Sequence, residues 1–248
     1  MKLWYKLFPN DLKIIAFNRG WWFYIVITVL GTILFTLYGN TLTPDKKLTY
    51  IMITSIIEFI ILRVYKLYMI HIRDDYRYFN ELPCYLCNQS TILCIIAAAT
   101  NNSHLMSFCI VMGTCGSLLA LTFPDKIVYN QPFYSLQTLG FYAYHSLLII
   151  TSLSFLTLGL YKADISDIFW NMLMLYALGT FTHFVNVFLI RTNLYPEANY
   201  SFTIHPDNGF TQMLYNFCPK PFFYMLPCPL ITGALTVLLL LFMRIFKK

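Results

Sequence analysis

Residues 21–38 read WWFYIVITVLGTILFTLY, an apolar run with no charged side chain, and it ends before Gly39, Asn40 and Pro44. A helix needs about 20 such residues to cross the hydrocarbon core of a bilayer. Similar apolar runs follow along the rest of the chain, at about 49–70, 82–100, 104–123, 133–160, 168–190 and 222–245. The pattern predicts an all-α fold, a polytopic membrane helix bundle with about seven transmembrane helices.

The composition of the whole chain supports a membrane protein. Of the 248 residues, 58% are hydrophobic and only 11% are charged, whereas a soluble domain carries about 25% charged residues. The net charge of +6 is therefore expected to face lipid headgroups, and no basic run is long enough to indicate nucleic-acid binding. We expect one integral membrane domain over residues 1–248.

Two segments lie outside the predicted spans. Residues 1–19 mix apolar and basic side chains, which is typical of an interfacial segment. Residues 191–221 form a long loop, and loops of this length are usually functional or disordered. Lys and Arg are more frequent on the side of the N-terminus, so the positive-inside rule favours a cytoplasmic N-terminus. The expected location is the cell membrane, as a multi-pass protein of a bacterium.

Polar residues inside the predicted spans are candidates for a site, because such residues are costly and usually functional. They gather on the N-terminal side of the membrane, at the start of the third span, in the fifth span, at the end of the sixth span and in the long loop. They are Cys87, Gln89, Gln137, His145, His183, Asn186, Asn199 and Tyr200.

Cys87 and His145 are the candidate catalytic pair. A thiol near a helix start becomes a nucleophile when an imidazole or the helix N-terminus stabilises its thiolate. Such a pair could take an acyl group from a membrane phospholipid as a thioester, while Gln89, Gln137 or Asn186 stabilises the oxyanion. The structural alternative is a buried thiol and a histidine that is hydrogen-bonded between helices.

Two further functions stay open. A transporter or lipid-handling carrier would use Glu58, His145 and His183 to bind or relay charge without covalent chemistry. A thiol oxidoreductase would use the C-x-x-C of Cys84 and Cys87. The His and Cys residues lack the spacing of a structural zinc site, so we expect neither a metal nor a cofactor.

Several short motifs occur in an order typical of one family. They are LPCYLC at 82–87, FPDKI at 123–127, FYSLQTLGFYAYHSLLI at 133–149, EANYSF at 197–202, and a proline and aromatic opening to the last span. In this order they resemble the YwaF-like integral membrane proteins of bacteria, which are similar to the eukaryotic transmembrane-164 acyltransferase family.

The resemblance implies acyl transfer between phospholipids through a cysteine and a histidine, here Cys87 and His145. The chain departs from the bacterial pattern L-P-x-H-L-C at one position, where Tyr85 replaces the expected histidine. Cys84 is not part of that pattern, which counts against the oxidoreductase. A shared fold does not by itself fix function.

Overall fold

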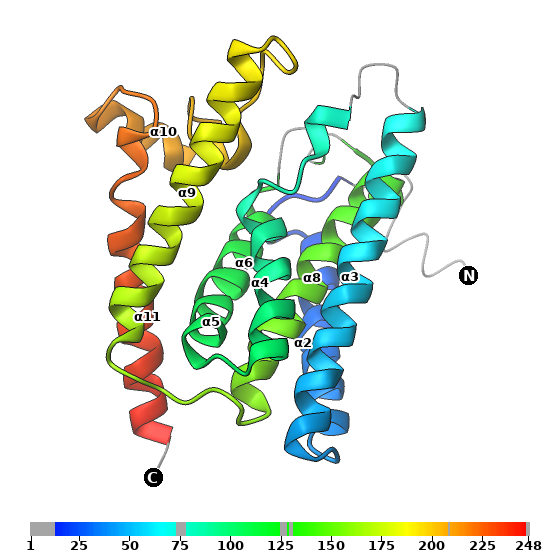
Figure 1. Ribbon diagram of the computed structural model, residues 1–248. Coiled ribbons are helices and arrows are strands. Elements are labelled where there is room, and N and C mark those ends of the chain that lie inside the picture. Colours follow the sequence, from blue (N-terminus) through cyan, green and yellow to red (C-terminus); the bar gives the residue numbers. More distant parts are fainter. Residues whose placement is uncertain (1–12, 73–77, 125–127, 129–130, 208, 247–248) are drawn as a thin grey trace. The chain divides into compact units, whose positions relative to one another are not determined.

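The structure is a computed structural model that describes residues 13–72, 78–124, 128, 131–207 and 209–246. All the elements named in this part of the chain are helices (Figure 1). The α-helices are α2 (Arg19–Gly39), α3 (Pro44–Ile72), α4 (Leu86–Thr100), α5 (Ser103–Phe108), α6 (Thr114–Thr122), α8 (Leu136–Thr157), α9 (Asp167–Arg191), α10 (Gly209–Phe217) and α11 (Cys228–Phe246).

Six helical segments among the described residues are long and apolar enough to cross a membrane. They are Arg19–Gly39, Pro44–Tyr68, Ser103–Thr122, Leu136–Thr157, Asp167–Arg191 and Phe223–Ile245, and α4 is a shorter apolar helix. The third of these segments joins α5 to α6 through a π-helical turn, η2 (Cys109–Gly113). The prediction of a polytopic helical membrane bundle is confirmed, and the chain is a multi-pass integral membrane protein.

The helix boundaries differ from the predicted runs where a cap or a turn intervenes. Helix α4 begins at Leu86 instead of residue 82, because the backbone forms a tight turn in which the Cys84 amide donates to the Leu82 carbonyl at 2.8 Å. Helix α8 begins at Leu136 because the Ser135 hydroxyl caps it by accepting from the Thr138 amide. The predicted loop 191–221 contains the short helix α10 and a 3₁₀ turn, η3 (Tyr200–Phe202).

The chain forms two compact units. Unit 1 comprises Met1–Tyr65 and Ser90–Tyr161, and unit 2 comprises Lys66–Gln89 and Lys162–Lys248. The single membrane domain over residues 1–248 stays a prediction. Most of the expected interfacial segment, residues 1–12, lies outside the described residues, as do residues 125–127 of the FPDKI motif.

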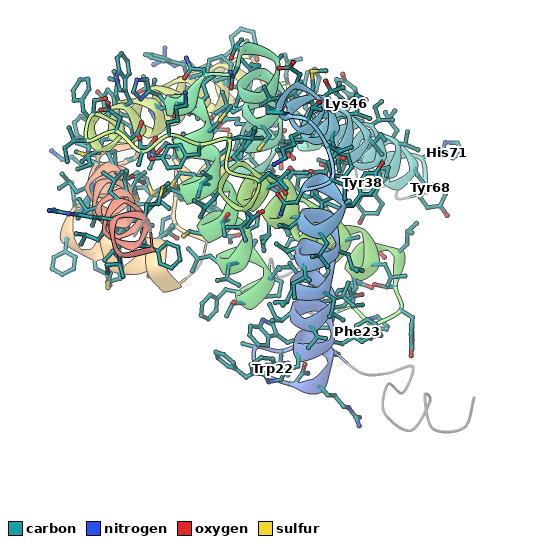
Figure 2. The ribbon with its side chains drawn as sticks, turned by 90° about the horizontal axis from the view of Figure 1, so that it is seen from below. Trp22, Phe23, Tyr38, Lys46, Tyr68 and His71 are labelled. Carbon is teal, nitrogen blue, oxygen red and sulfur yellow. The ribbon has the colours of Figure 1, made fainter. Side chains whose placement is uncertain are left out.

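In unit 1, helices α2 and α8 pack closely through small residues. A Cβ atom on Gly31 would lie 2.8 Å from the Ile150 side chain, and the Thr28 hydroxyl donates to the Ser146 hydroxyl at 2.7 Å. Small residues and hydroxyl bonds of this kind are what hold helices together in a bilayer. Figure 2 shows Trp22 and Tyr38 near opposite ends of α2, both exposed, and such aromatic residues favour the two membrane interfaces.

In unit 2, helices α9 and α11 run side by side (Figure 1). The Asn171 side-chain amide donates to the Thr236 hydroxyl at 2.9 Å, and both side chains are fully buried. A Cβ atom on Gly233 would lie 2.8 Å from the Met172 sulfur, so the glycine allows this close approach. The far end of α9 carries the polar residues of the candidate site.

Candidate functional site

Cys87 lies in the first turn of α4 and is half-buried. The partial positive charge at a helix N-terminus favours a thiolate there. Cys84 lies in the turn before the helix and is buried, and neither cysteine forms a disulfide. The structure therefore places Cys87 at the start of a helix, as the sequence predicts, and its role as a nucleophile stays a prediction.

The EANYSF segment holds the start of α4 in place. The Ser201 hydroxyl donates to the Cys84 carbonyl at 3.1 Å and accepts from the Leu86 amide at 3.1 Å. Ser201 and Phe202 have positive φ angles of 50° and 58°. Residues other than glycine rarely adopt this left-handed backbone conformation, and those that do often lie at functional sites. This unusual backbone turn places the hydroxyl that caps the helix of Cys87.

Tyr200 ties the same segment to the chain before α4. Its hydroxyl accepts from the Leu82 amide at 3.2 Å and donates to the Phe79 carbonyl. The ring is 1% exposed, and burial raises the pKa of the phenol above its ordinary value because the charged phenolate loses its water. Tyr200 therefore acts as a neutral hydroxyl that accepts one bond and donates another.

Asn186 on α9 anchors the segment from the other side. Its amide nitrogen donates to the Tyr200 carbonyl and to the Thr203 hydroxyl, each at 2.9 Å. Its amide oxygen accepts from the Tyr200 backbone amide at 3.0 Å. Asn186 is fully buried, so both ends of its side chain hold the loop.

A second hydrogen-bonded line joins α9 to the entry of α4. Gln89 donates to the Thr182 hydroxyl at 3.0 Å, and Thr182 donates to the Cys84 carbonyl at 3.3 Å. His183 lies one residue further along α9, and its Nδ1 atom is 3.3 Å from the Thr203 hydroxyl. The carbonyl of Cys84 thus has two hydroxyl partners, Thr182 and Ser201.

Asn199 closes the next turn of the loop. Its amide oxygen accepts from the backbone amides of Ile204 and His205, at 3.1 and 3.2 Å. Its amide nitrogen donates to the His205 carbonyl at 2.9 Å. Asn199 is therefore bonded mainly to the loop's own backbone.

His145 lies in unit 1, in the first half of α8, and is 7% exposed. Its Nδ1 atom is 2.8 Å from the Phe141 carbonyl oxygen. A carbonyl can only accept, so Nδ1 carries the proton and the neutral ring has its lone pair on Nε2. This tautomer is the one that a general base acting through Nε2 requires. Gln137 lies one residue into α8 and is half-buried.

Glu58 lies in the middle of α3 in unit 1 and is 1% exposed. The Thr91 hydroxyl of α4 donates to its Oε1 atom at 2.8 Å, and the Thr151 hydroxyl of α8 donates to its Oε2 atom at 3.3 Å. The Tyr144 hydroxyl is 2.9 Å from that of Thr91. Glu58 therefore connects three helices of unit 1.

The structure thus brings together one subset of the predicted residues. In unit 2 a continuous network includes Gln89, Asn186 and Tyr200 around the entry of the helix that carries Cys87. Cys87 and His145 belong to different units, and their pairing stays a prediction. The roles in substrate binding of Glu58, Gln89, Gln137, His183, Asn186, Asn199 and Tyr200 also stay predictions.

Sequence reasoning missed the hydroxyl residues that organise both clusters. Ser201 and Thr182 bind the backbone before α4, and Thr91, Thr151 and Tyr144 surround Glu58. Serine and threonine are common inside membrane helices, where they bond to their own backbone. One available signal was the spacing of Cys87 and Thr91, which lie four residues apart and so share a face of α4.

The fold and the site define a multi-pass α-helical membrane protein with a thiol at the start of a short apolar helix. The chain matches the TMEM164 family over residues 16–247. It therefore belongs to the TMEM164 family. No curated protein and no solved structure matches the chain.

Proposed function

We propose that this protein is a phospholipid-directed acyltransferase that carries the acyl group on the thiol of Cys87, with His145 as general base. The observation that carries the proposal is the position of Cys87 in the first turn of α4, where a loop of unusual backbone conformation caps the helix. Family membership supports the proposal. The membrane in question is the cell membrane of a bacterium, with a cytoplasmic N-terminus.

The proposed reaction has two transfers. In the first, His145 Nε2 takes the thiol proton, and the sulfur attacks the ester carbon of a membrane phospholipid. The bond from that carbon to the glycerol oxygen breaks, and His145 returns the proton to this oxygen. In the second, His145 takes the proton of a hydroxyl on an acceptor lipid, whose oxygen attacks the thioester carbon. The carbon–sulfur bond then breaks, and the proton returns to the thiol.

The residues of unit 2 have supporting roles in this proposal. Asn186 and Tyr200 hold the loop, and the loop holds the entry of α4, so they position Cys87. Gln89 follows Cys87 by two residues and is a candidate donor to the oxyanion, although its amide nitrogen already bonds to Thr182. Positioning of this kind lowers the barrier because it is completed before the substrate reacts.

The experiment is to trap the thioester on purified full-length protein in lipid vesicles that contain a phospholipid with an alkyne-tagged acyl chain. We expect a tagged protein whose label is released by hydroxylamine. Cys87→Ala should remove this label, while Cys218→Ala, a half-buried free thiol of the same unit, should keep it. Label on the Cys87→Ala variant, or no label on the unaltered chain, would contradict the proposal.

A lipid-handling carrier without covalent chemistry is the second candidate. The buried Glu58 favours it, because a carboxyl in the middle of a membrane helix is costly and usually functional. This candidate predicts that Cys87→Ala leaves lipid movement unchanged and that Glu58→Gln abolishes it. Measuring both variants in the same vesicles separates the two functions.

A further inference from the structure

Glu58 has an unusual set of partners for a buried acid. It lies 14 residues after Pro44, the start of α3, or about 21 Å along the helix, which is near the middle of a bilayer. Among the residues that the structure describes, its partners are the hydroxyls of Thr91 and Thr151. A hydroxyl group can donate a hydrogen bond to a charged carboxylate or accept one from a protonated carboxyl group. A Lys or Arg side chain can only donate.

Of the two hydroxyl partners, Thr91 is also in contact with the hydroxyl of Tyr144. The Thr91 hydroxyl has a single proton, which it donates to Glu58 Oε1. The Tyr144 hydroxyl, 2.9 Å away, must then donate to Thr91 for both bonds to exist. The two bonds therefore run in one direction, from Tyr144 through Thr91 to Glu58.

The Thr151 hydroxyl has a choice of acceptors. It lies 3.3 Å from Glu58 Oε2, but also 3.0 Å from the Leu147 carbonyl and 3.2 Å from the Leu148 carbonyl of its own helix. When Glu58 is ionised, Thr151 donates to Oε2. When Oε2 carries a proton, the carboxyl group donates to Thr151, and Thr151 donates to the Leu147 carbonyl. Both patterns leave every hydrogen-bonding group of this pair with a partner.

From this geometry we infer that Glu58 and Thr151 form a proton-binding site inside unit 1, in which the Thr151 hydroxyl reverses its direction when the proton arrives. The ligand is a single proton, and the site is separate from the thiol chemistry proposed for Cys87. When the proton binds, the Thr151 hydroxyl donates to the Leu147 carbonyl of α8 instead of to Glu58. Hydrogen bonds from a threonine to the carbonyl four residues earlier often bend a helix.

The other titratable groups on the helices around Glu58 have contacts of their own. On α3, the Arg63 guanidinium lies 5.2 Å above the Phe59 ring. On α4, the Cys94 sulfur is 3.5 Å from the Ser152 hydroxyl. On α8, His145 packs against the Tyr144 ring and bonds to the Phe141 carbonyl. Among the described residues, the hydrogen-bond partners of the Glu58 carboxyl group are therefore hydroxyl groups.

The test is infrared difference spectroscopy of the full-length protein in lipid nanodiscs, recorded between alkaline and acidic pH. We expect a carboxylic acid C=O band to appear on acidification and to be absent in Glu58→Gln. Glutamine keeps an acceptor for Thr91 and donates to Thr151, so it mimics the protonated state and should fold. Glu81→Gln, which alters a buried carboxyl paired with Lys66 at 2.6 Å, is the control and should keep the band.

Thr151→Val provides the second measurement, since it keeps the shape of the side chain and removes the reversing hydroxyl. We expect the Glu58 band to move to higher frequency, because the protonated carboxyl group loses its hydrogen-bond acceptor. An unchanged spectrum in Glu58→Gln would overturn the proton site. A Glu58 band with the same frequency in Thr151→Val would overturn the role of Thr151.

Discussion

The polar cluster of unit 1 and that of unit 2 are built from different kinds of hydrogen bond. Around Glu58 the bonds join side chain to side chain across three helices. Around the entry of α4 they join side chains to backbone groups of Phe79, Leu82, Cys84, Leu86 and Tyr200. In the first cluster, substitutions can remove both partners of a hydrogen bond. In the second cluster, a substitution removes only the side chain, and the backbone amide or carbonyl is left without its hydrogen-bond partner.

The largest effect should come from the second cluster. Asn186→Leu keeps the approximate volume of the side chain but leaves the amide and the carbonyl of Tyr200 without their partner. We expect a loss of about 3 kcal/mol in the free energy of unfolding, because buried groups left unsatisfied cost more than the bond itself contributes. The measurement is unfolding by SDS in mixed micelles.

The matched control for that variant is the double change Asn186→Leu with Thr203→Val. It also removes Thr203, the side-chain partner of Asn186 among the described residues, and leaves the backbone partners in place, so stability should not recover. If the stability of the double variant recovered toward that of the unaltered chain, the loss in Asn186→Leu would come from the unpaired Thr203 hydroxyl and not from the backbone of Tyr200.

An intermediate effect is expected from the first cluster. Thr91→Val should cost about 1 kcal/mol, as hydrogen bonds between membrane helices usually do. Adding Tyr144→Phe should cost less than the same change in the unaltered chain, because the bond to Thr91 is already lost. The double-mutant cycle for unfolding should therefore give a favourable coupling between the two residues. Additive losses would contradict the bond between Tyr144 and Thr91.

The smallest effect concerns the backbone of the EANYSF loop. Ser201→Ala loses the hydroxyl but keeps a side chain at a positive φ angle, and should lower stability by about 0.5 kcal/mol. Ser201→Gly loses the same hydroxyl but relieves the strain, since glycine adopts this conformation at little cost. The thermal midpoint of the glycine variant should exceed that of the alanine variant, and the reverse order would mean that the turn is unstrained.

The sequence predicted the membrane helices well because hydropathy and length dominate in a bilayer. The run at 21–38 corresponds to α2 (Arg19–Gly39), and the run at 168–190 to α9 (Asp167–Arg191). The start of α4 was placed too early, since Pro83 suits a first helical turn and nothing local reveals that Ser201, more than a hundred residues away, caps Leu86.

The candidate site was predictable only in part. The position of Cys87 at a helix start follows from the local sequence and is what the structure has. Asn186 bonds to a loop, and Thr151 bonds to Glu58. Both contacts depend on which segments of the chain meet in the fold, and the local sequence does not reveal this. Polar residue type alone cannot separate a side chain that holds the fold from one that meets a substrate.

The shortness of α4 has a consequence for the depth of its thiol. Its 15 residues span about 22 Å, which is about 8 Å less than the hydrocarbon core. If its Thr100 end reaches one membrane surface, hydrophobic mismatch leaves the Cys87 end below the opposite headgroups. Irregular backbone is tolerated at that depth only where protein covers it, and Tyr200 and Ser201 supply this cover for Leu82 and Leu86. Reagents that partition into the bilayer should then reach the thiol more readily than reagents dissolved in water.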